Sequence, residues 1–221
     1  MLAEGALDGR KQELMALARE HGIPVYRESR DRLGHQGVVA EVAEFEWVEF
    51  DALVDEAPPP AFLVVLDQVE DPRNLGAVIR TADGAGVHGV VVPERKTAPP
   101  SDVAVNASAG ALHHAKVARV RNVSDTLTNL KEKGIWTVGL SPDARDAWYR
   151  FDYREPVAIV LGSEGKGLRK RVAATCDALV SLPQRGHVES LNLSVAAGIV
   201  LYEVVRQRSQ LIGSEPPSEK P

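Results

Sequence analysis

Beyond residue 60, short apolar runs alternate with segments of helical periodicity. The runs are apolar throughout rather than at every second position, and they span residues 62–66, 87–92, 115–120, 135–140, 157–161 and 178–182. The helical segments span residues 74–85, 102–109, 124–133, 168–175 and 192–210. Continuously apolar strands that alternate with helices are typical of a parallel sheet with helices on both faces. The pattern therefore predicts an α/β fold for residues 58–212.

The first 57 residues predict a smaller α/β unit. Residues 8–21 have the apolar spacing of an amphipathic helix that Gly22 ends, and short strands are expected at 23–26 and 38–42. One helix and two strands bury little surface, so we expect a partial unit whose beginning is cut off. An acidic linker follows, and three consecutive prolines at 58–60 predict a stiff boundary.

Two further segments lie outside this alternation. Residues 141–155 form a long connection with four aromatic side chains, which fits either a flap or partner surface or a loop anchored by aromatic packing. Residues 213–221 are rich in Pro, Ser and Glu, a composition that predicts a disordered tail.

The composition excludes several classes of protein. Of the 221 residues, 44% are apolar, which is too many for a disordered chain. No apolar run approaches the roughly 18 residues of a membrane span, and residues 1–10 lack the pattern of a secretory signal. The one cysteine, Cys176, allows neither an intramolecular disulfide nor a cysteine-pair metal site. We therefore expect a cytoplasmic protein without a membrane segment.

The net charge of −5 argues at first against a nucleic-acid partner, but the distribution of charge weakens that argument. Seven acidic residues and no basic one lie within residues 41–56. The rest of the chain holds 26 basic and 24 acidic residues, which is close to neutral. Charge alone therefore neither identifies nor excludes RNA.

Two glycine-rich stretches resemble nucleotide-binding loops without matching them. Gly84-Ala-Gly-Val-His-Gly89 has dinucleotide-binding spacing, yet it ends a helix and precedes a strand, the reverse of the required order. Leu161-Gly-Ser-Glu-Gly-Lys-Gly-Leu168 follows a strand, but its glycines are too close together for an ATPase phosphate loop. Three glycines around Glu164 at the carboxyl end of a strand nevertheless favour a ligand-binding loop. A solvated acid in a turn is the structural alternative.

Polar residues at two helix starts add further candidates. Asn74 lies at the start of the helix after the first apolar run, with Arg80 about a turn and a half later, and Ser190 and Asn192 precede the last helix. Taken singly, an N-terminal cap explains Asn74 or Ser190, and a surface ion pair explains Arg80. The six histidines show no pair four residues apart with an adjacent acid, so no metal site is expected.

Taken together, three stretches carry a family resemblance. Asn74-Leu-Gly-Ala-Val-Ile-Arg80, Leu161-Gly-Ser-Glu-Gly-Lys-Gly-Leu168 and Ser190-Leu-Asn-Leu-Ser-Val-Ala-Ala197 resemble, in order and spacing, the three signature motifs of the SpoU (TrmH-type) RNA ribose 2′-O-methyltransferases. The resemblance covers residues 62–208. His35-Gln-Gly-Val-Val-Ala40 also resembles the end of the small RNA-binding domain of the RlmB-like subgroup, which modifies guanosine in 23S ribosomal RNA.

The resemblance implies a C-terminal trefoil knot that binds S-adenosylmethionine, and a homodimer formed through the last helix. The residues implied as cofactor contacts are Leu140, Leu161, Gly162, Leu182, Ser190 and Leu191. Those implied in catalysis are Asn74, Arg80, Glu164, Ser190 and Asn192. Arg80 would activate the ribose 2′-hydroxyl, either as a base or as a clamp for phosphate and alkoxide. The reaction requires no metal.

The implied activity is transfer of a methyl group from S-adenosylmethionine to the ribose 2′-hydroxyl of a guanosine in 23S ribosomal RNA. RNA is therefore the expected partner, and residues 1–57 would form a truncated RNA-binding unit with its linker. A tRNA guanosine is the alternative substrate. A catalytically silent RNA-binding assembly factor and a nucleotide-binding enzyme that uses the Gly162 loop are the alternative classes.

Overall fold

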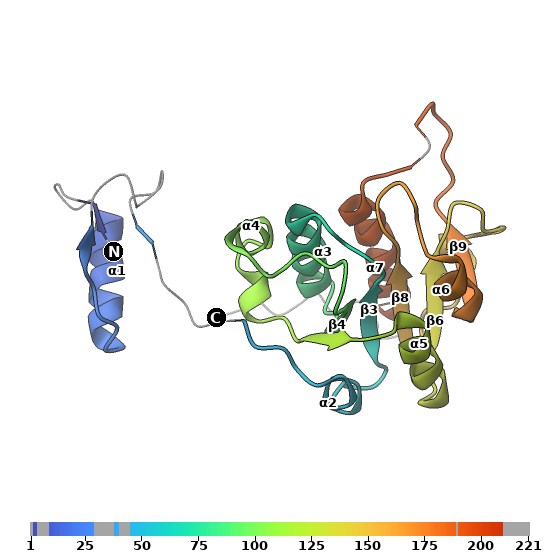
Figure 1. Ribbon diagram of the computed structural model, residues 1–221, viewed down its shortest axis with the longest axis horizontal. Helices are drawn as coiled ribbons and strands as arrows, with labels where there is room; N and C mark the ends of the chain where they lie inside the picture. The colour runs from blue at the N-terminus through green and yellow to red at the C-terminus, as the bar shows by residue number, and fades with distance from the viewer. Residues whose placement is uncertain (1, 4–8, 29–37, 40–44, 189, 210–221) are drawn as a thin grey trace. The chain divides into compact units, whose positions relative to one another are not determined.

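The computed structural model describes residues 2–3, 9–28, 38–39, 45–188 and 190–209 (Figure 1). The chain divides into two compact units, Met1–Glu44 and Phe45–Pro221. The second unit begins before the three prolines at 58–60, where the sequence predicts the boundary. Of the two units, the second carries all the residues proposed for chemistry.

In the first unit, α1 (Gly9–Glu20) matches the expected helix, and Gly22 ends it with a φ of +65°. The strand predicted at 23–26 is wrong. Those residues are exposed coil, and the parallel pair is formed instead by β1 (Leu2–Ala3) and β2 (Arg27–Glu28). Apolar residues form a stable strand only where they can pack on a neighbouring surface. Helix α1 offers no such surface, because it buries no side chain. The strand predicted at 38–42 and the resembling segment 35–40 fall largely outside the described residues.

The second unit contains a sheet of seven strands, and every pairing between them is parallel, as predicted. The strands are β3 (Phe62–Leu66), β4 (Gly89–Pro93), β5 (Val117–Val120), β6 (Trp136–Leu140), β7 (Asp146–Ala147), β8 (Val157–Leu161) and β9 (Ala178–Ser181). Their order in the sheet is β5-β4-β3-β8-β6-β9-β7. The centre is β3 beside β8, whose register pairs Phe62 with Val157 and Leu66 with Leu161.

Helices cover both faces of this sheet (Figure 1). They are α2 (Phe50–Asp55), α3 (Pro72–Gly84), α4 (Asp102–Ala107), α5 (Val123–Glu132), α6 (Lys170–Thr175) and α7 (Leu193–Ser209), with single-turn helices η2 (Ala111–His113) and η3 (Trp148–Arg150). Alternate residues of each strand supply the two cores. Val64 packs with α3, α4 and α7, whereas Leu63 and Val65 pack with α2, α5 and α6. In the described part of the chain, no helix is both long and apolar enough to cross a membrane.

The described part of the acidic segment, residues 45–56, packs on the sheet instead of forming an extended linker. Its helix α2 buries Leu53 and Val54 in the core. Asp55 then accepts a hydrogen bond from Lys133 at 2.6 Å, and Glu56 accepts one from Lys116 at 2.9 Å. These exposed ion pairs add little stability. Apolar burial therefore holds the segment in place.

The connection at 141–155 is anchored by aromatic packing, one of the two interpretations left open by the sequence. Tyr153 is fully buried, and its hydroxyl donates to the carbonyl of Trp148 at 2.8 Å. Burial raises the pKa of Tyr153, which keeps the phenol protonated. The two-residue strand β7 within the connection pairs with β9 at the edge of the sheet.

The glycines from Gly84 to Gly89 form a helix end and a turn, as predicted. Helix α3 ends at Gly84, Gly86 has a φ of +73°, and β4 starts at Gly89. Strand β4 starts later than the apolar run because Val87 and His88 belong to this turn. The stretch is therefore not a dinucleotide-binding loop.

Gly76 sets how closely α3 and α4 approach. A Cβ at Gly76 would overlap the carbonyl oxygen of Ala104 and lie 2.8 Å from the Cβ of Ala107. We predict that Gly76→Ala lowers the free energy of unfolding by about 1–3 kcal/mol, although alanine has the higher helix propensity. Urea denaturation measures the change. Gly84→Ala on the same helix is the control, because its Cβ would meet only the Tyr202 hydroxyl, at 3.3 Å. Equal stability of Gly76→Ala and wild type would contradict this packing.

Cys176 is a structural residue whose thiol donates to the carbonyl of Val172 at 3.3 Å. Burial raises its pKa to about 12, so the reactive thiolate is scarce at neutral pH. We predict that the folded chain reacts with a disulfide reagent far more slowly than the chain unfolded in guanidinium chloride. A thiol colour assay followed over time measures both rates. Equal rates in the two states would show that the thiol is accessible.

Candidate active site

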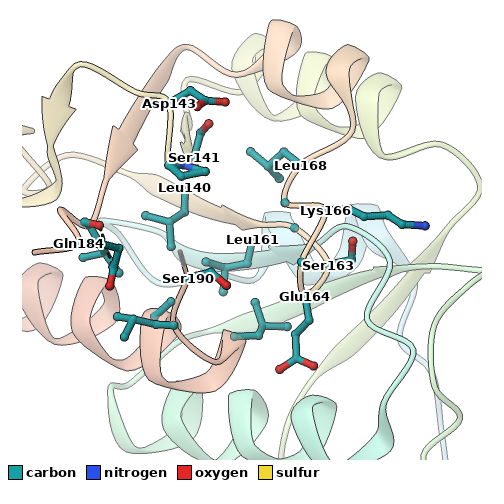
Figure 2. Close-up of a pocket in the computed structure, with 18 residues that line it drawn as sticks. Leu140, Ser141, Asp143, Leu161, Ser163, Glu164, Lys166, Leu168, Gln184 and Ser190 are labelled. Carbon is teal, nitrogen blue, oxygen red and sulfur yellow. Dashed lines mark hydrogen bonds between the residues drawn. The ribbon is translucent and has the colours of Figure 1, made fainter. Parts of the chain in front are cut away.

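A cavity of about 460 Å³ lies at the carboxyl ends of β8, β6 and β9 (Figure 2). In a parallel sheet these ends share one edge, so the loops that follow the three strands meet there. The lining residues are Leu140, Ser141, Pro142, Asp143, Leu161, Gly162, Ser163, Glu164, Gly165, Lys166, Gly167, Leu168, Leu182, Gln184, Ser190, Leu191, Leu193 and Ala196. All six cofactor contacts expected from the sequence are among them.

The loop after β8 is folded tightly upon itself. Ser163 and Gly167 exchange two backbone hydrogen bonds, of 3.1 Å and 2.9 Å. Gly165 and Gly167 have positive φ angles, and a Cβ at Gly162 would overlap the backbone of Gly167. The loop can therefore form only because glycine occupies these positions. Its tip directs the side chains of Glu164 and Lys166 in different directions (Figure 2).

Asn192 joins the three motif segments. Its Nδ2 donates to Glu164 Oε1 at 2.7 Å and to Asn74 Oδ1 at 3.0 Å. Its Oδ1 accepts from the backbone N–H of Ser194 at 2.9 Å and from the Ser194 hydroxyl at 2.6 Å. Asn192 therefore caps α7, a role that the sequence offered to Ser190. Ser190 is exposed and lines the cavity instead.

Asn74 lies within the first turn of α3 and does not cap it. The cap is Asp71, which accepts from the backbone N–H of Arg73 at 2.8 Å, and Pro72 is the first helical residue. The Arg73 guanidinium also bonds Asp71, which lowers the pKa of that carboxyl. With the cap supplied by Asp71, Asn74 is buried, and its side-chain oxygen accepts from Asn192.

Arg80 is not brought to the cavity within one chain. It lies six residues beyond Asn74, about one and two-thirds helical turns, so it leaves α3 on a different side. Its side chain is exposed and makes no hydrogen bond or ion pair with any of the described residues. The structure therefore places Glu164 and Ser190 at the cavity and joins Asn192 to both Glu164 and Asn74, whereas Arg80 is not among the lining residues.

Several lining residues were missed from the sequence. Ser141, Pro142 and Asp143 follow β6 directly, and Gln184 follows β9. Their position just after apolar strands was the available signal, because a parallel sheet gathers such residues at one edge. Leu193 and Ala196 come from the first turn of α7. Among the described residues, no group of three or more His, Cys, Asp or Glu side chains is placed to hold a metal ion.

Comparison with known proteins points to one family. The family model of the SpoU rRNA Methylase family matches residues 61–202. The 23S rRNA (guanosine-2′-O-)-methyltransferase RlmB of Pseudomonas putida is 41% identical over 216 residues, covering 94% of this chain and 87% of that protein. YacO of Bacillus subtilis, assigned to the TrmH family of tRNA/rRNA methyltransferases, is 43% identical over 217 residues with the same two coverages.

Solved structures agree. The SpoU methyltransferase AviRb from Streptomyces viridochromogenes, in complex with its cofactor AdoMet (S-adenosylmethionine), has a TM-score of 0.80 at 27% identity. The match covers 95% of this chain and 82% of AviRb. An AdoMet-bound rRNA methyltransferase from Sinorhizobium meliloti has a TM-score of 0.71 at 29% identity, covering 88% of this chain and 76% of that one. The chain with its three joined motifs belongs to the SpoU rRNA methylase family.

Proposed function

We propose that this chain transfers a methyl group from S-adenosylmethionine to the ribose 2′-hydroxyl of a guanosine in 23S ribosomal RNA. The observation that carries the proposal is the contact of Asn192 with both Asn74 and Glu164 beside the cavity. Relatives named as 23S rRNA guanosine 2′-O-methyltransferases support the substrate, since they are 39% to 42% identical over most of the chain.

The cavity fits S-adenosylmethionine. Its volume of about 460 Å³ lies in the range of small-molecule sites. Leu140, Leu161, Leu182 and Leu191 offer apolar walls for an adenine ring, and Gly162 lets backbone approach the ligand without a side chain between them. When bound, the cofactor supplies a methyl group already activated by the positive sulfonium, so the chain's residues need only hold and orient the reactants.

Arg80 acts as a clamp in this proposal. The 2′-hydroxyl is a weak nucleophile at neutral pH, and a guanidinium stays protonated there, so Arg80 is a poor proton acceptor. A planar guanidinium is well suited to hold an RNA phosphate and to stabilise the alkoxide that develops on the ribose. The hydroxyl proton passes to water. Positioning can supply about 7–11 kcal/mol, which makes the clamp sufficient without base catalysis.

Glu164, Asn192, Ser190 and Asn74 orient the ribose opposite the methyl group. The Asn192 amide is held at both its oxygen and its nitrogen, so it fixes the direction of the Glu164 carboxylate. Ser190 lines the cavity with an exposed hydroxyl that can donate to substrate. A preorganised polar rim of this kind requires little rearrangement when the ribose binds.

A second copy of the chain brings Arg80 to the cavity. Helices α3 and α7 pack together, and α7 leaves Val195 and Tyr202 half exposed, at 51% and 52%. We propose that this face joins two copies and that Arg80 of one copy completes the cavity of the other. The Arg80 guanidinium is exposed and has no partner among the residues that the structure describes, which supports this arrangement.

Two finer features belong to the same proposal. The chain would form a trefoil knot in the segments after β6, β8 and β9, which line the cavity. The similarity to AviRb supports this knot. Residues 1–44 would hold the RNA substrate, which the resemblance of segment 35–40 supports.

Arg80→Ala is predicted to lower kcat for methyl transfer by at least about 100-fold, because it removes the clamp on the developing charge. Binding of S-adenosylmethionine should be largely unchanged, since Arg80 is absent from the cavity lining of its own chain and its proposed partners are the RNA phosphate and the alkoxide. Transfer of a radioactive methyl group to 23S rRNA and to bulk tRNA measures the activity and separates the two substrates. Arg80→Lys keeps the charge without the planar fork and should fall in between. Wild-type turnover by Arg80→Ala would refute the clamp.

Asn192→Asp replaces the side-chain NH2 group with an oxygen and leaves the shape of the side chain almost unchanged. The new carboxylate would face Glu164 Oε1 and Asn74 Oδ1, two acceptors, at hydrogen-bond distance. We predict that repulsion displaces Glu164 and lowers kcat by about 100-fold, as small misplacements of reacting groups do. Single-turnover methyl transfer measures the chemical step. Asn106→Asp, the same change at an exposed position of α4, is the control. An unaltered rate for Asn192→Asp would contradict its role.

A further inference from the structure

Asp67 is a buried carboxylate at the end of β3, outside every motif recognised in the sequence. The residue is 1% exposed, and its side chain is fully buried. One carboxylate oxygen, Oδ1, accepts a hydrogen bond from Arg169 Nε at 2.8 Å and lies 2.6 Å from Nη2 of the same guanidinium as an ion pair. The other oxygen, Oδ2, accepts from the Arg169 backbone N–H at 3.1 Å. The backbone N–H of Asp67 donates to the carbonyl of Leu161 at 2.7 Å.

These bonds hold both ends of the glycine loop to one residue. Leu161 is the last residue before the loop, and Arg169 is the first residue after Leu168 closes it. Leu168 also packs toward Gly139 of β6, where a Cβ would lie 2.8 Å from the Leu168 Cδ1. Asp67 therefore ties the two loop ends together, in addition to the backbone bonds between Ser163 and Gly167.

The buried carboxylate of Asp67 requires a charged, hydrogen-bonded partner. A carboxylate removed from water is costly unless ionic and hydrogen-bonded partners surround it, so the buried Asp67 strongly favours the one arrangement that keeps Arg169 in place. The next residue, Gln68, has a φ of +68°, an uncommon conformation for a non-glycine residue. It turns the chain toward Asp71 and α3, where Asn74 lies. The same connection thus carries the loop anchor and the first motif.

We propose that Asp67 and Arg169 are positioning residues that hold the glycine loop in the shape required by the cofactor. Neither is among the residues that line the cavity. They act through Gly162 and Glu164, which the loop presents to the cavity and to Asn192. This inference rests on the proposed function, because it takes S-adenosylmethionine as the ligand of the cavity.

Calorimetric titration with S-adenosylmethionine, well below the unfolding temperature, tests the inference. Arg169→Ala should raise the dissociation constant by about tenfold or more, since hydrogen bonds to a charged group are lost. Arg171→Ala is the matched control, because Arg171 lies in the first turn of α6, which begins directly after Arg169. Among the described residues, its side chain makes one exposed contact, of 3.5 Å with Asp125. Arg169→Lys keeps the positive charge beside Asp67 but lacks the planar guanidinium. It should therefore fold more readily than Arg169→Ala and bind S-adenosylmethionine with an affinity between those of Arg169→Ala and wild type.

Hydrogen exchange locates the effect. In Arg169→Ala, peptides that cover residues 161–169 should exchange faster than in wild type, while those from β3 and β4 keep their protection. A purely structural contact would instead lower the unfolding temperature and leave cofactor affinity unchanged in both Arg169 variants, which would overturn the inference. Failure of the wild-type chain to bind S-adenosylmethionine would overturn the proposed function, and this inference with it.

Discussion

The side-chain amide of Asn192 joins three parts of the chain that are distant in sequence. Its nitrogen serves Glu164 in the loop after β8 and Asn74 in the first turn of α3, while its oxygen caps α7. Each partner depends on a local feature: three glycines fold the loop, Asp71 frees Asn74 from capping, and Leu193 buries the start of α7. Without this amide, the polar groups around the cavity would lack a fixed arrangement.

The parallel sheet makes such a meeting possible. Because all strand pairs are parallel, the connections after β3, β8, β6 and β9 reach the same edge, although residues from Asp67 to Ser190 contribute to it. The two apolar cores on either face hold the strands, and Asp67 transmits that rigidity to the glycine loop. A rigid scaffold with its chemistry on loops suits a reaction that depends on positioning.

Sequence reasoning captured the sheet better than the site. The strand at 157–161 was predicted to the residue, because Pro156 and Gly162 bound an apolar run. The prediction of a strand at 23–26 was wrong, because local propensity does not show whether a neighbouring strand is there to pair with. Asp71 was passed over as a cap, although Pro72 at the first helical position was the available signal. The bonds between Asn192, Glu164 and Asn74 span up to 118 residues, so no periodicity could predict them.

The claim at the centre of this account is that the cavity at the carboxyl edge is a methyl-donor site and not a nucleotide phosphate site. Calorimetry on the purified wild-type chain, titrated separately with S-adenosylmethionine and with ATP, tests it most directly. The account predicts saturable binding of S-adenosylmethionine, one molecule per chain, and no binding of ATP. Binding of ATP without binding of S-adenosylmethionine would contradict it.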